Sequence, residues 1–222
     1  MPTLGVVTIG QAPRDDIVDD IAAELGASAA VVQAGALDDL RDDEIAALAP
    51  GQGDPVLVTR LRDGRAVRVR EEAVFPSLQA AVARVEAAGA DVTLVVCTGD
   101  FPPLRHRRPL LLSGPLMTAG VAGVASALRL AALCPDPAQV ASVRSKWRGR
   151  GVDVVGVWAA SPYVEREAAA ARAARAIRGA DAVVLDCMGY DRQTKAVVEG
   201  ASGLRAFLAR QVVGRLAGLM LR

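Results

Sequence analysis

The chain contains one stretch of sequence twice, and this repeat constrains its fold more than any other feature. Residues 89–99 read Gly-Ala-Asp-Val-Thr-Leu-Val-Val-Cys-Thr-Gly, and residues 179–189 read Gly-Ala-Asp-Ala-Val-Val-Leu-Asp-Cys-Met-Gly. In each copy a glycine ends an Ala-rich helix, and a short apolar run has the length of a buried parallel strand. A Cys-x-Gly sequence then follows. The repeat predicts two similar halves, each with a cysteine at the carboxyl end of a strand.

Cys97 and Cys187 occupy the positions at which ligands bind in open α/β sheets, because such ligands lie beyond the carboxyl ends of the strands. The simpler alternative is that each is a small buried apolar residue, as free cysteines often are. The matched placement weakens this alternative without removing it.

Strand and helix patterns alternate along the chain, which is typical of α/β proteins with mainly parallel sheets. We expect a first strand at residues 4–9, a short glycine turn, and a helix with Pro13 at its first position. In the first half, Asp63-Gly64 lies between two segments that alternate apolar residues with arginines. This pattern predicts a β-hairpin insertion with its arginines on a solvated face.

We expect two lobes related by a pseudo-twofold axis. The first would comprise residues 1–115, joined by the C-terminal segment 204–222, and the second would comprise residues 116–203. The strand that ends at Cys134 resembles the opening strand of the chain. The closing helix would either pack inside the protein or form the seam of a homodimer through its apolar residues, Val212, Val213, Leu216 and Leu219.

Composition argues against several classes of protein. A net charge of +1 disfavours nucleic-acid and anionic-membrane partners. The N-terminus lacks the basic region of a signal peptide, and no apolar run approaches the length of a membrane span. An odd number of cysteines without a close pair fits reduced thiols, so we expect a cytoplasmic protein. The single histidine, His106, cannot form a two-histidine metal site, and we expect no metal.

The turn after the first strand is a second candidate site. Thr8, Gln11 and Arg14 lie near the start of a helix, where backbone N–H groups can bind a carboxylate or a phosphate. The alternative for Arg14 is a solvated first-turn residue paired with an acid. The basic loop at residues 105–108 could also attract an anion, although a solvated loop is the simpler interpretation.

Several segments resemble the AroM family. They are residues 8–17 (Thr-Ile-Gly-Gln-Ala-Pro-Arg-Asp-Asp-Ile), the Asp-Gly hairpin, and residues 185–190 (Leu-Asp-Cys-Met-Gly-Tyr). The similarity extends over essentially the whole chain, including residues 46–50 and Lys146-Trp147. The resemblance implies an aspartate/glutamate racemase-like fold, with two α/β lobes, an active cleft between them and one cysteine from each lobe. AroM-type proteins are associated with aromatic amino-acid (shikimate) metabolism by name and gene context.

We therefore expect proton transfer without a cofactor on a small carboxylic acid, with Cys97 and Cys187 as the catalytic pair. One thiolate would remove a proton next to the carboxylate, and the opposite thiol would return one to the other face. The substrate-binding candidates supply side chains and backbone N–H groups for the carboxylate and the enolate. They are Thr8, Gln11, Arg14, Thr98, Gly99, Ser161 and Gly189.

Two alternatives stay open. If only Cys187 is competent, decarboxylation with protonation on one face, or isomerisation of a double bond, would need one thiol. A non-catalytic binding or regulatory protein of aromatic-acid metabolism would keep the cleft without the acid/base pair. The residues after the cysteines favour this second alternative, because racemases typically follow the first cysteine with Asn-Thr and the second with Thr-His.

Overall fold

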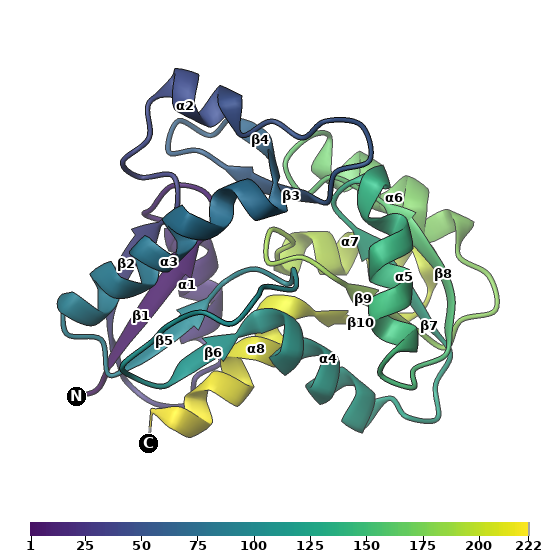
Figure 1. The fold of residues 1–222 in the computed structure, drawn as a ribbon. Coiled ribbons are helices and arrows are strands. Elements are labelled where there is room, and N and C mark those ends of the chain that lie inside the picture. The colour runs from purple at the N-terminus through teal and green to yellow at the C-terminus, as the bar shows by residue number, and fades with distance from the viewer. Residues whose placement is uncertain (222) are drawn as a thin grey trace. The chain divides into compact units, whose positions relative to one another are not determined.

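The computed structural model describes residues 1–221, which divide into two compact α/β units (Figure 1). Unit 1 comprises Met1–Gly114 and the described residues from Gly214 onward, and unit 2 comprises Pro115–Val213. Each unit is built around a four-stranded sheet in which every strand pair is parallel. The predicted α/β class with mainly parallel sheets is confirmed.

The sheet of unit 1 has the strand order β2-β1-β5-β6. Its strands are β1 (Thr3–Thr8), β2 (Ala30–Gly35), β5 (Val92–Val95) and β6 (Leu110–Leu112), and its helices are α1 (Asp15–Ala22), α2 (Asp42–Ala47) and α3 (Glu71–Ala87). The predicted hairpin is present as β3 (Val56–Arg60) paired antiparallel with β4 (Ala66–Arg70). Helix α3 buries one side against the sheet and the hairpin, in a core that includes Val7, Leu57, Val69, Leu78 and Val82.

The sheet of unit 2 has the strand order β10-β9-β7-β8. Its strands are β7 (Leu130–Cys134), β8 (Val154–Ala159), β9 (Ala182–Leu185) and β10 (Arg205–Leu208). The helical segments of the chain after β6, in order, are α4 (Ser113–Val124), the 3₁₀ turn η1 (Pro137–Gln139), α5 (Val140–Arg148), α6 (Arg166–Ala176), α7 (Arg192–Ser202), α8 (Ala209–Ala217) and the 3₁₀ turn η2 (Gly218–Met220). The last four residues of α8 and all of η2 belong to unit 1. The core uses alanines of α6 against leucines and valines of the sheet, as a chain with few aromatic residues requires.

The two sheets have the same topology. Numbered along the chain within its own unit, each sheet has the order 2-1-3-4, and each repeat contains the third strand. Gly89 and Gly179, which open the repeats, adopt positive φ angles of 92° and 70°, where glycine is favoured over other residues. Cys97 and Cys187 come two residues after the last residues of these third strands, Val95 and Leu185, so each cysteine lies at the carboxyl end of its strand, as the repeat predicted.

The aspartate of each repeat connects the third strand to the first. The backbone N–H of Asp91 donates to the carbonyl of Thr3, and the N–H of Thr3 donates to the Asp91 carboxylate, both at 2.8 Å. Asp181 and Arg129 form the same reciprocal pair in unit 2, again at 2.8 Å in both directions. The Gly-Ala-Asp sequence therefore has the same structural role twice, because it ends a helix and aligns two strands.

The C-terminal segment divides differently from the prediction. We expected residues 204–222 to join the first lobe, but β10 pairs with β9 and lies in unit 2. Only the chain from Gly214 onward joins unit 1, where a Cβ at Gly214 would lie 2.9 Å from the Cβ of Glu24 on the loop after α1. Within the closing helix, Val213 is fully buried, whereas Leu219 in η2 is exposed.

The start of helix α1 also differs from the prediction. Pro13 lies two residues before α1 rather than at its first position, because Arg14 has a non-helical backbone and precedes the helix. Helix α3 begins at Glu71 and has Pro76 at its sixth position, where proline removes one hydrogen bond of the helix.

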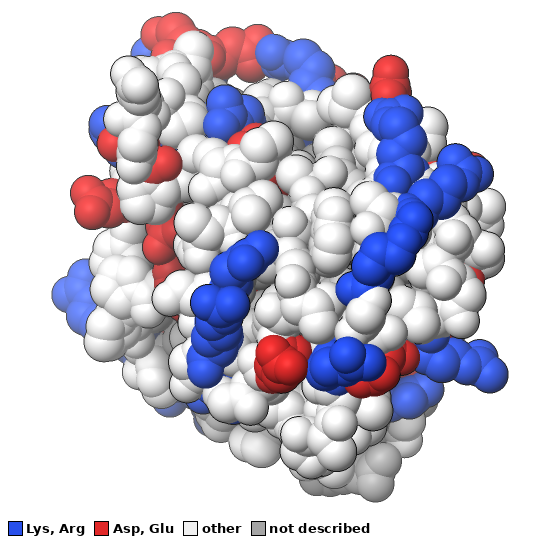
Figure 2. Space-filling model, turned by 90° about the vertical axis from the view of Figure 1, so that its right-hand side faces the viewer, with Lys and Arg blue, Asp and Glu red and all other residues white. Residues whose placement is uncertain are grey.

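Charged side chains at the surface mostly pair locally. In unit 2, Arg129 pairs with Asp181, and Arg172 pairs with Glu165. The face in Figure 2 carries its Lys and Arg side chains in separate groups with uncharged surface between them. Such exposed pairs contribute little to stability. Among the described residues, no helix is both long enough and apolar enough to cross a membrane.

Candidate functional site

The Cys97 turn, defined here as residues 97–99, follows β5 in unit 1. The N–H of Gly99 donates to the sulfur of Cys97 at 3.5 Å. Gly99 packs beneath the hairpin, since a Cβ there would lie 3.0 Å from Cδ2 of Leu57. Cys97 is partly buried and Thr98 is buried. A larger residue at position 99 would require the end of the Leu57 side chain to shift.

The Cys187 turn, defined as residues 187–189, follows β9 in unit 2 by the same geometry. The N–H of Gly189 donates to the sulfur of Cys187 at 3.3 Å. A Cβ at Gly189 would lie 2.7 Å from Cγ of Pro162 and 2.7 Å from the hydroxyl oxygen of Tyr163. No larger residue fits here without moving the loop after β8.

An N–H that points at a sulfur stabilises the thiolate more than the thiol, because it interacts more strongly with the negative charge. The thiolate is the form of cysteine that acts as a base or a nucleophile. Both turns therefore have a geometry that suits chemistry, and neither is explained by apolar packing of the cysteine alone.

A buried ion pair supports the Cys187 turn from one side. The fully buried carboxylate of Asp186 lies 2.7 Å from Nζ of Lys146 and accepts a 2.8 Å hydrogen bond from Nε1 of Trp147. Both partners come from α5. Ninety positions earlier, unit 1 has Val96 in place of Asp186. The two turns thus share their local geometry, but only the second has a charged anchor at this position.

Arg210 supports the Cys187 turn from α8. Its guanidinium is buried, with Nε donating to the carbonyl of Met188 at 2.7 Å and Nη2 to the carbonyl of Gly189 at 3.2 Å. Sequence reasoning missed this residue. An arginine that follows the apolar run Phe207-Leu208-Ala209 was the available signal.

Tyr190 follows the Cys187 turn, and a buried hydrogen bond fixes its side chain. It is fully buried and donates its hydroxyl proton to the carbonyl of Ala160 at 2.5 Å. Burial raises the pKa of this phenol well above its ordinary value of 10.0. The hydroxyl therefore stays protonated and acts as a structural donor.

Cys134 has a different environment from the other two cysteines. It ends β7, and its carbonyl accepts the N–H of Ala160, as the carbonyl of Thr8 accepts the N–H of Ala36 in unit 1. Burial raises the pKa of the Cys134 thiol to about 12, and its sulfur contacts the carbonyl of Asp136 at 3.4 Å. A thiol that stays neutral at ordinary pH is unsuited to act as a base.

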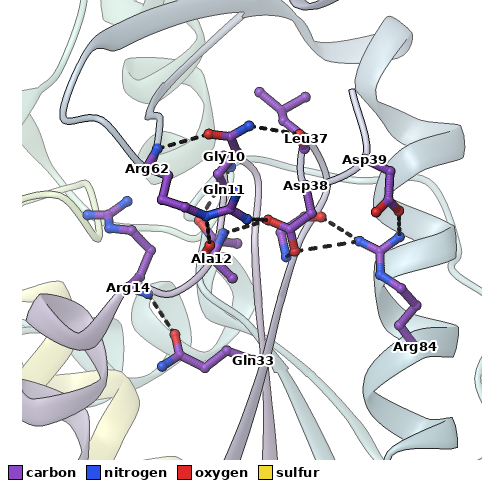
Figure 3. Close-up of polar contacts among 12 residues, drawn as sticks. Gly10, Gln11, Ala12, Arg14, Gln33, Leu37, Asp38, Asp39, Arg62 and Arg84 are labelled. Atoms are coloured by element: carbon purple, nitrogen blue, oxygen red, sulfur yellow. Dashed lines mark hydrogen bonds and ion pairs between the residues drawn. The ribbon is translucent and has the colours of Figure 1, made fainter. Parts of the chain in front are cut away.

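The Gln11 loop, defined as residues 9–14, connects β1 to α1 at the carboxyl end of β1 (Figure 3). The side-chain amide of Gln11 is engaged at both ends, because its nitrogen donates to the carbonyl of Leu37 and its oxygen accepts the N–H of Arg62. Thr8 is buried, and its hydroxyl accepts the N–H of Gly10 at 3.4 Å. This loop is held by contacts that run to β2 and to the hairpin.

Asp38 is the centre of this network (Figure 3). Its carboxylate accepts the N–H groups of Ala12 at 2.8 Å and Gly35 at 2.6 Å. Arg62 donates to the same carboxylate at 3.1 Å, and Nη2 of Arg84 lies 3.8 Å from it. The acid therefore connects the loops that follow β1 and β2.

Arg14 is buried and paired with an acid. Its guanidinium makes two hydrogen bonds to Asp16, at 2.8 and 3.0 Å, and its backbone N–H donates to Gln33 at 2.7 Å. Arg60 also donates to Asp16, at 3.1 Å. The side chains of Arg60 and Arg62 are 36 % and 55 % exposed, as expected for a solvated face, but both also donate to residues of the Gln11 loop or α1, which the prediction did not include.

Ser161 is also engaged within its own loop. Its hydroxyl oxygen accepts the N–H groups of Tyr163 at 3.1 Å and Val164 at 3.0 Å. This turn places the Tyr163 hydroxyl beside Gly189. Tyr163 was not among the predicted site residues.

The basic loop at 105–108 lies over α3 of unit 1. The backbone N–H groups of Arg107 and Arg108 both donate to the carboxylate of Glu86, at 2.8 and 2.9 Å. The loop is exposed. Among all the described residues, the structure has no group of three or more His, Cys, Asp or Glu side chains that could hold a metal ion.

Glu71, at the start of α3, is an acid that the sequence reasoning missed. Partial burial raises its pKa, and Asp100 beside it raises the pKa further. Asp100 directly follows the Cys97 turn, so unit 1 has a carboxyl group near this turn that holds its proton to a higher pH than an ordinary glutamate.

The predicted residues of unit 1 gather at one edge of the sheet. Val96 donates its N–H to the carbonyl of Val7 at 2.8 Å, so that the Cys97 turn begins beside the end of β1 and the Gln11 loop. In unit 2, Asp186 donates to the carbonyl of Leu133 at 2.9 Å in the equivalent way. Each unit thus brings its cysteine to the carboxyl edge of its sheet.

Residues 4–221 match the family model described as AroM protein. The chain belongs to the AroM family. Comparison with curated protein sequences finds no match. Within the AroM chain, the residues that carried the family resemblance coincide with the Gln11 loop, the hairpin and the Cys187 turn with its Lys146-Trp147 anchor.

Solved structures show which fold this AroM protein has. Aspartate racemase of Picrophilus torridus is 12 % identical, with 96 % of this chain and 91 % of that chain covered at a TM-score of 0.60. A liganded double mutant of arylmalonate decarboxylase is 15 % identical, with 100 % and 92 % covered at 0.65. Maleate isomerase of Pseudomonas putida S16 is 14 % identical, with 99 % and 92 % covered at 0.62. The predicted racemase-like fold is confirmed.

Proposed function

We propose that this protein carries out acid/base chemistry without a cofactor on a small carboxylic acid, with Cys97 and Cys187 as its catalytic residues. One observation carries the proposal. Two cysteines follow the third strands of sheets with the same topology, and each sulfur accepts the N–H of the glycine two residues later, at 3.5 and 3.3 Å. Packing alone gives no reason for this geometry to occur twice.

The reaction needs one proton to leave carbon and one to return. A thiolate takes the proton next to the carboxylate, and the electron pair of the C–H bond moves into the enolate. A thiol on the other face gives its proton to the same carbon, and the cycle leaves the first sulfur protonated and the second ionised. After the product leaves, the first sulfur loses its proton to solvent and the second takes one up, which restores the starting state, so a racemase or isomerase of this type needs no cofactor.

Groups near the thiols supply the remaining requirement, which is recognition of the carboxylate and stabilisation of the enolate. We propose Thr98 for this purpose, together with the N–H groups of Gly99 and Gly189, which would have to turn from the sulfurs to the substrate. Arg14 would have to exchange Asp16 for the substrate carboxylate, and Gln11 would have to release Leu37 or Arg62. Ser161 would act through the loop that carries Tyr163.

The structural neighbours support the reaction class. Their names describe a racemase, a decarboxylase and an isomerase that act on aspartate, an arylmalonate and maleate, which are all carboxylic acids. Decarboxylation with protonation on one face would need one thiol. The charged anchor at Asp186 favours Cys187 for that role.

Proton exchange with solvent tests the proposal. The wild-type protein would be incubated in D2O with amino acids, hydroxy acids and shikimate-type acids, and the Cα–H signals followed by NMR. We expect at least one acid to lose its Cα–H signal with the wild-type protein and to keep it with a Cys97→Ala, Cys187→Ala double variant. Equal exchange by both proteins would overturn the proposal.

The second candidate is a non-catalytic protein that binds such an acid. The residues after the two cysteines favour it, because Thr98-Gly99 and Met188-Gly189 replace the Asn-Thr and Thr-His that typically follow the two cysteines of racemases. An acid that raises the melting temperature without exchanging its Cα–H would support this candidate over the enzyme.

A further inference from the structure

A single peptide group connects Arg210 to the sulfur of Cys187. The carbonyl of Met188 accepts a 2.7 Å hydrogen bond from Nε of Arg210. The N–H on the other side of that same peptide bond belongs to Gly189, and it donates to Cys187 Sγ at 3.3 Å. The three groups form one chain of hydrogen bonds that runs from a cation to a sulfur.

Hydrogen bonds in such a chain strengthen one another. A cation that donates to a carbonyl draws electron density along the amide, so that the N–H of the same peptide becomes a stronger donor. The effect is largest where water is excluded, and both Arg210 and the turn are buried. The second contact of Arg210, to the carbonyl of Gly189 at 3.2 Å, holds the orientation of this peptide.

We propose that Arg210 is a positioning residue that keeps the Gly189 N–H directed at Cys187 and polarises it, and that it thereby maintains the sulfur as a thiolate. The proposed action of Arg210 runs through this peptide group. The proposal extends the proposed function, because a thiolate at residue 187 is the form that the acid/base chemistry requires.

Other charged or titratable groups of unit 2 also surround the turn. The negative charge of Asp186 disfavours a negative charge on the Cys187 sulfur. The ammonium of Lys146, 2.7 Å from that carboxylate, offsets this effect. Cys134 and Tyr190 keep their protons at ordinary pH. The groups that face the turn from the elements packed against it are Asp186 with Lys146, Cys134, Tyr163, Tyr190, and Asp191 with its partner Arg166.

Thiol alkylation across a pH series tests this role without a substrate. Iodoacetamide would be reacted with the folded protein, and the rate at Cys187 measured by peptide mass spectrometry, with Cys97 in the same molecules as an internal reference. The variants are Arg210→Gln, which removes the charge, and Arg210→Lys, which keeps it. Arg172→Gln is the matched control, because Arg172 is an exposed arginine of unit 2 that pairs with the exposed Glu165.

We expect Arg210→Gln to slow the alkylation of Cys187 roughly tenfold near neutral pH, since a hydrogen bond to an ionised group is lost or weakened. The rates should converge at high pH, where the thiol is ionised in every variant. Arg210→Lys should fall between Arg210→Gln and the wild type, and Arg172→Gln should match the wild type.

A purely structural role predicts a different result. If Arg210 only held the loop in place, its loss would expose Cys187 and speed alkylation at every pH, and this outcome would overturn the proposal. An unchanged profile would do so as well. If Arg210→Gln does not fold, Arg210→Lys carries the test through the same pH profile. A shifted profile without proton exchange on any acid would uphold the role of Arg210 and overturn the proposed function instead.

Discussion

At the residue scale, the surroundings of the three cysteines decide what each can do. Cys97 and Cys187 accept N–H groups at their sulfurs, whereas Cys134 lies against the carbonyl of Asp136 in a buried site. An N–H group favours a negative sulfur, whereas burial disfavours it and is the main cause of the raised pKa of Cys134. Residue type alone therefore does not distinguish Cys134 from the two cysteines that we propose as catalytic residues.

The raised pKa of Cys134 predicts how stability depends on pH. Burial raises this pKa from 9.0 to about 12, so that the folded protein holds the proton more tightly than the unfolded chain. The resulting stability is fully present below the unfolded value and is lost as the pH rises through the range between the two values. We expect the free energy of unfolding to fall by about 1.4 kcal/mol from this thiol alone between about pH 8 and pH 10.

The measurement is chemical denaturation at both pH values with wild-type protein and the Cys134→Ala variant. The variant lacks the titrating thiol, so its stability should depend less steeply on pH in this range. The comparison uses the difference between two slopes, which makes it insensitive to the packing lost with the sulfur. Parallel slopes would show that Cys134 ionises as easily in the folded protein as in the unfolded chain.

The Asp186 carboxylate leads to a second prediction at this scale. Asp186→Asn would leave the ammonium of Lys146, which is only 11 % exposed, without its counter-charge. Breaking one partner of a buried pair typically costs about 3–5 kcal/mol, and we expect a loss of that order in the free energy of unfolding. Denaturation with urea measures it.

Asp181→Asn is the matched control, because Asp181 also pairs with an arginine in unit 2 but lies at the surface. It should change stability little. Similar losses from both substitutions would contradict the view that burial makes the Asp186 pair important.

At the element scale, the hairpin holds the loop that follows β1. A Cβ at Gly10 would meet Thr59 and the backbone of Arg60, so β3 lies directly against this loop. Arg62 donates to the carbonyl of Ala12 at 2.7 Å, and Asp38 accepts the N–H of the same residue. An insertion that looked like a solvated edge from its sequence is therefore a structural support.

We predict that Asp38→Ala loosens this loop. The substitution leaves the N–H groups of Ala12 and Gly35 without their carboxylate acceptor, and buried donors without partners are costly. Amide hydrogen exchange should become faster across residues 10–14 and at Gly35. Mass spectrometry of the exchanged peptides measures it.

Asp39→Ala provides the control. Asp39 is adjacent in sequence and pairs with Arg84 at 2.7 Å, but it is largely exposed. Its loss should leave the exchange of residues 10–14 as in the wild type. If the amides of residues 10–14 exchanged as slowly in Asp38→Ala as in the wild type, the arginines alone would hold the loop.

The local sequence pattern predicted the helices and strands well, and the contacts between distant residues less well. The signals that succeeded act over only a few residues, and the structure has each feature as expected. They are the Asp63-Gly64 pair, the glycines at 89 and 179, and the apolar runs before Cys97 and Cys187. The contacts of Gln11, Arg14 and Arg210 join residues far apart in the chain. One sequence contains no signal that pairs Arg210 with Met188 or Arg62 with Ala12, so these roles needed the fold.

At the scale of the whole molecule, the chain uses one topology twice and then varies it. The 2-1-3-4 strand order, the reciprocal aspartate contacts and the N–H to sulfur geometry are common to both units. The supports of the two turns differ. The Cys97 turn packs against Leu57 of the hairpin, whereas the Cys187 turn lies between a buried ion pair and a buried arginine.

Because the two turns have different supports, we expect the two thiols to respond differently to substitutions of the residues around them. The repeat explains why two cysteines have matched geometry, and the charged supports explain why the second is the stronger candidate for chemistry on one face. Both inferences depend on whether each thiol moves protons on a carboxylic acid.

The most direct test is deuterium incorporation by the single-cysteine variants, with an acid that the wild-type protein exchanges in D2O. Cys97→Ala, Cys187→Ala and, as a control, Cys134→Ala would each be followed by NMR. The account predicts that loss of Cys187 abolishes exchange, that loss of Cys97 abolishes inversion of configuration, and that Cys134→Ala exchanges as the wild type does. Exchange and inversion that survive the loss of Cys187 would contradict it.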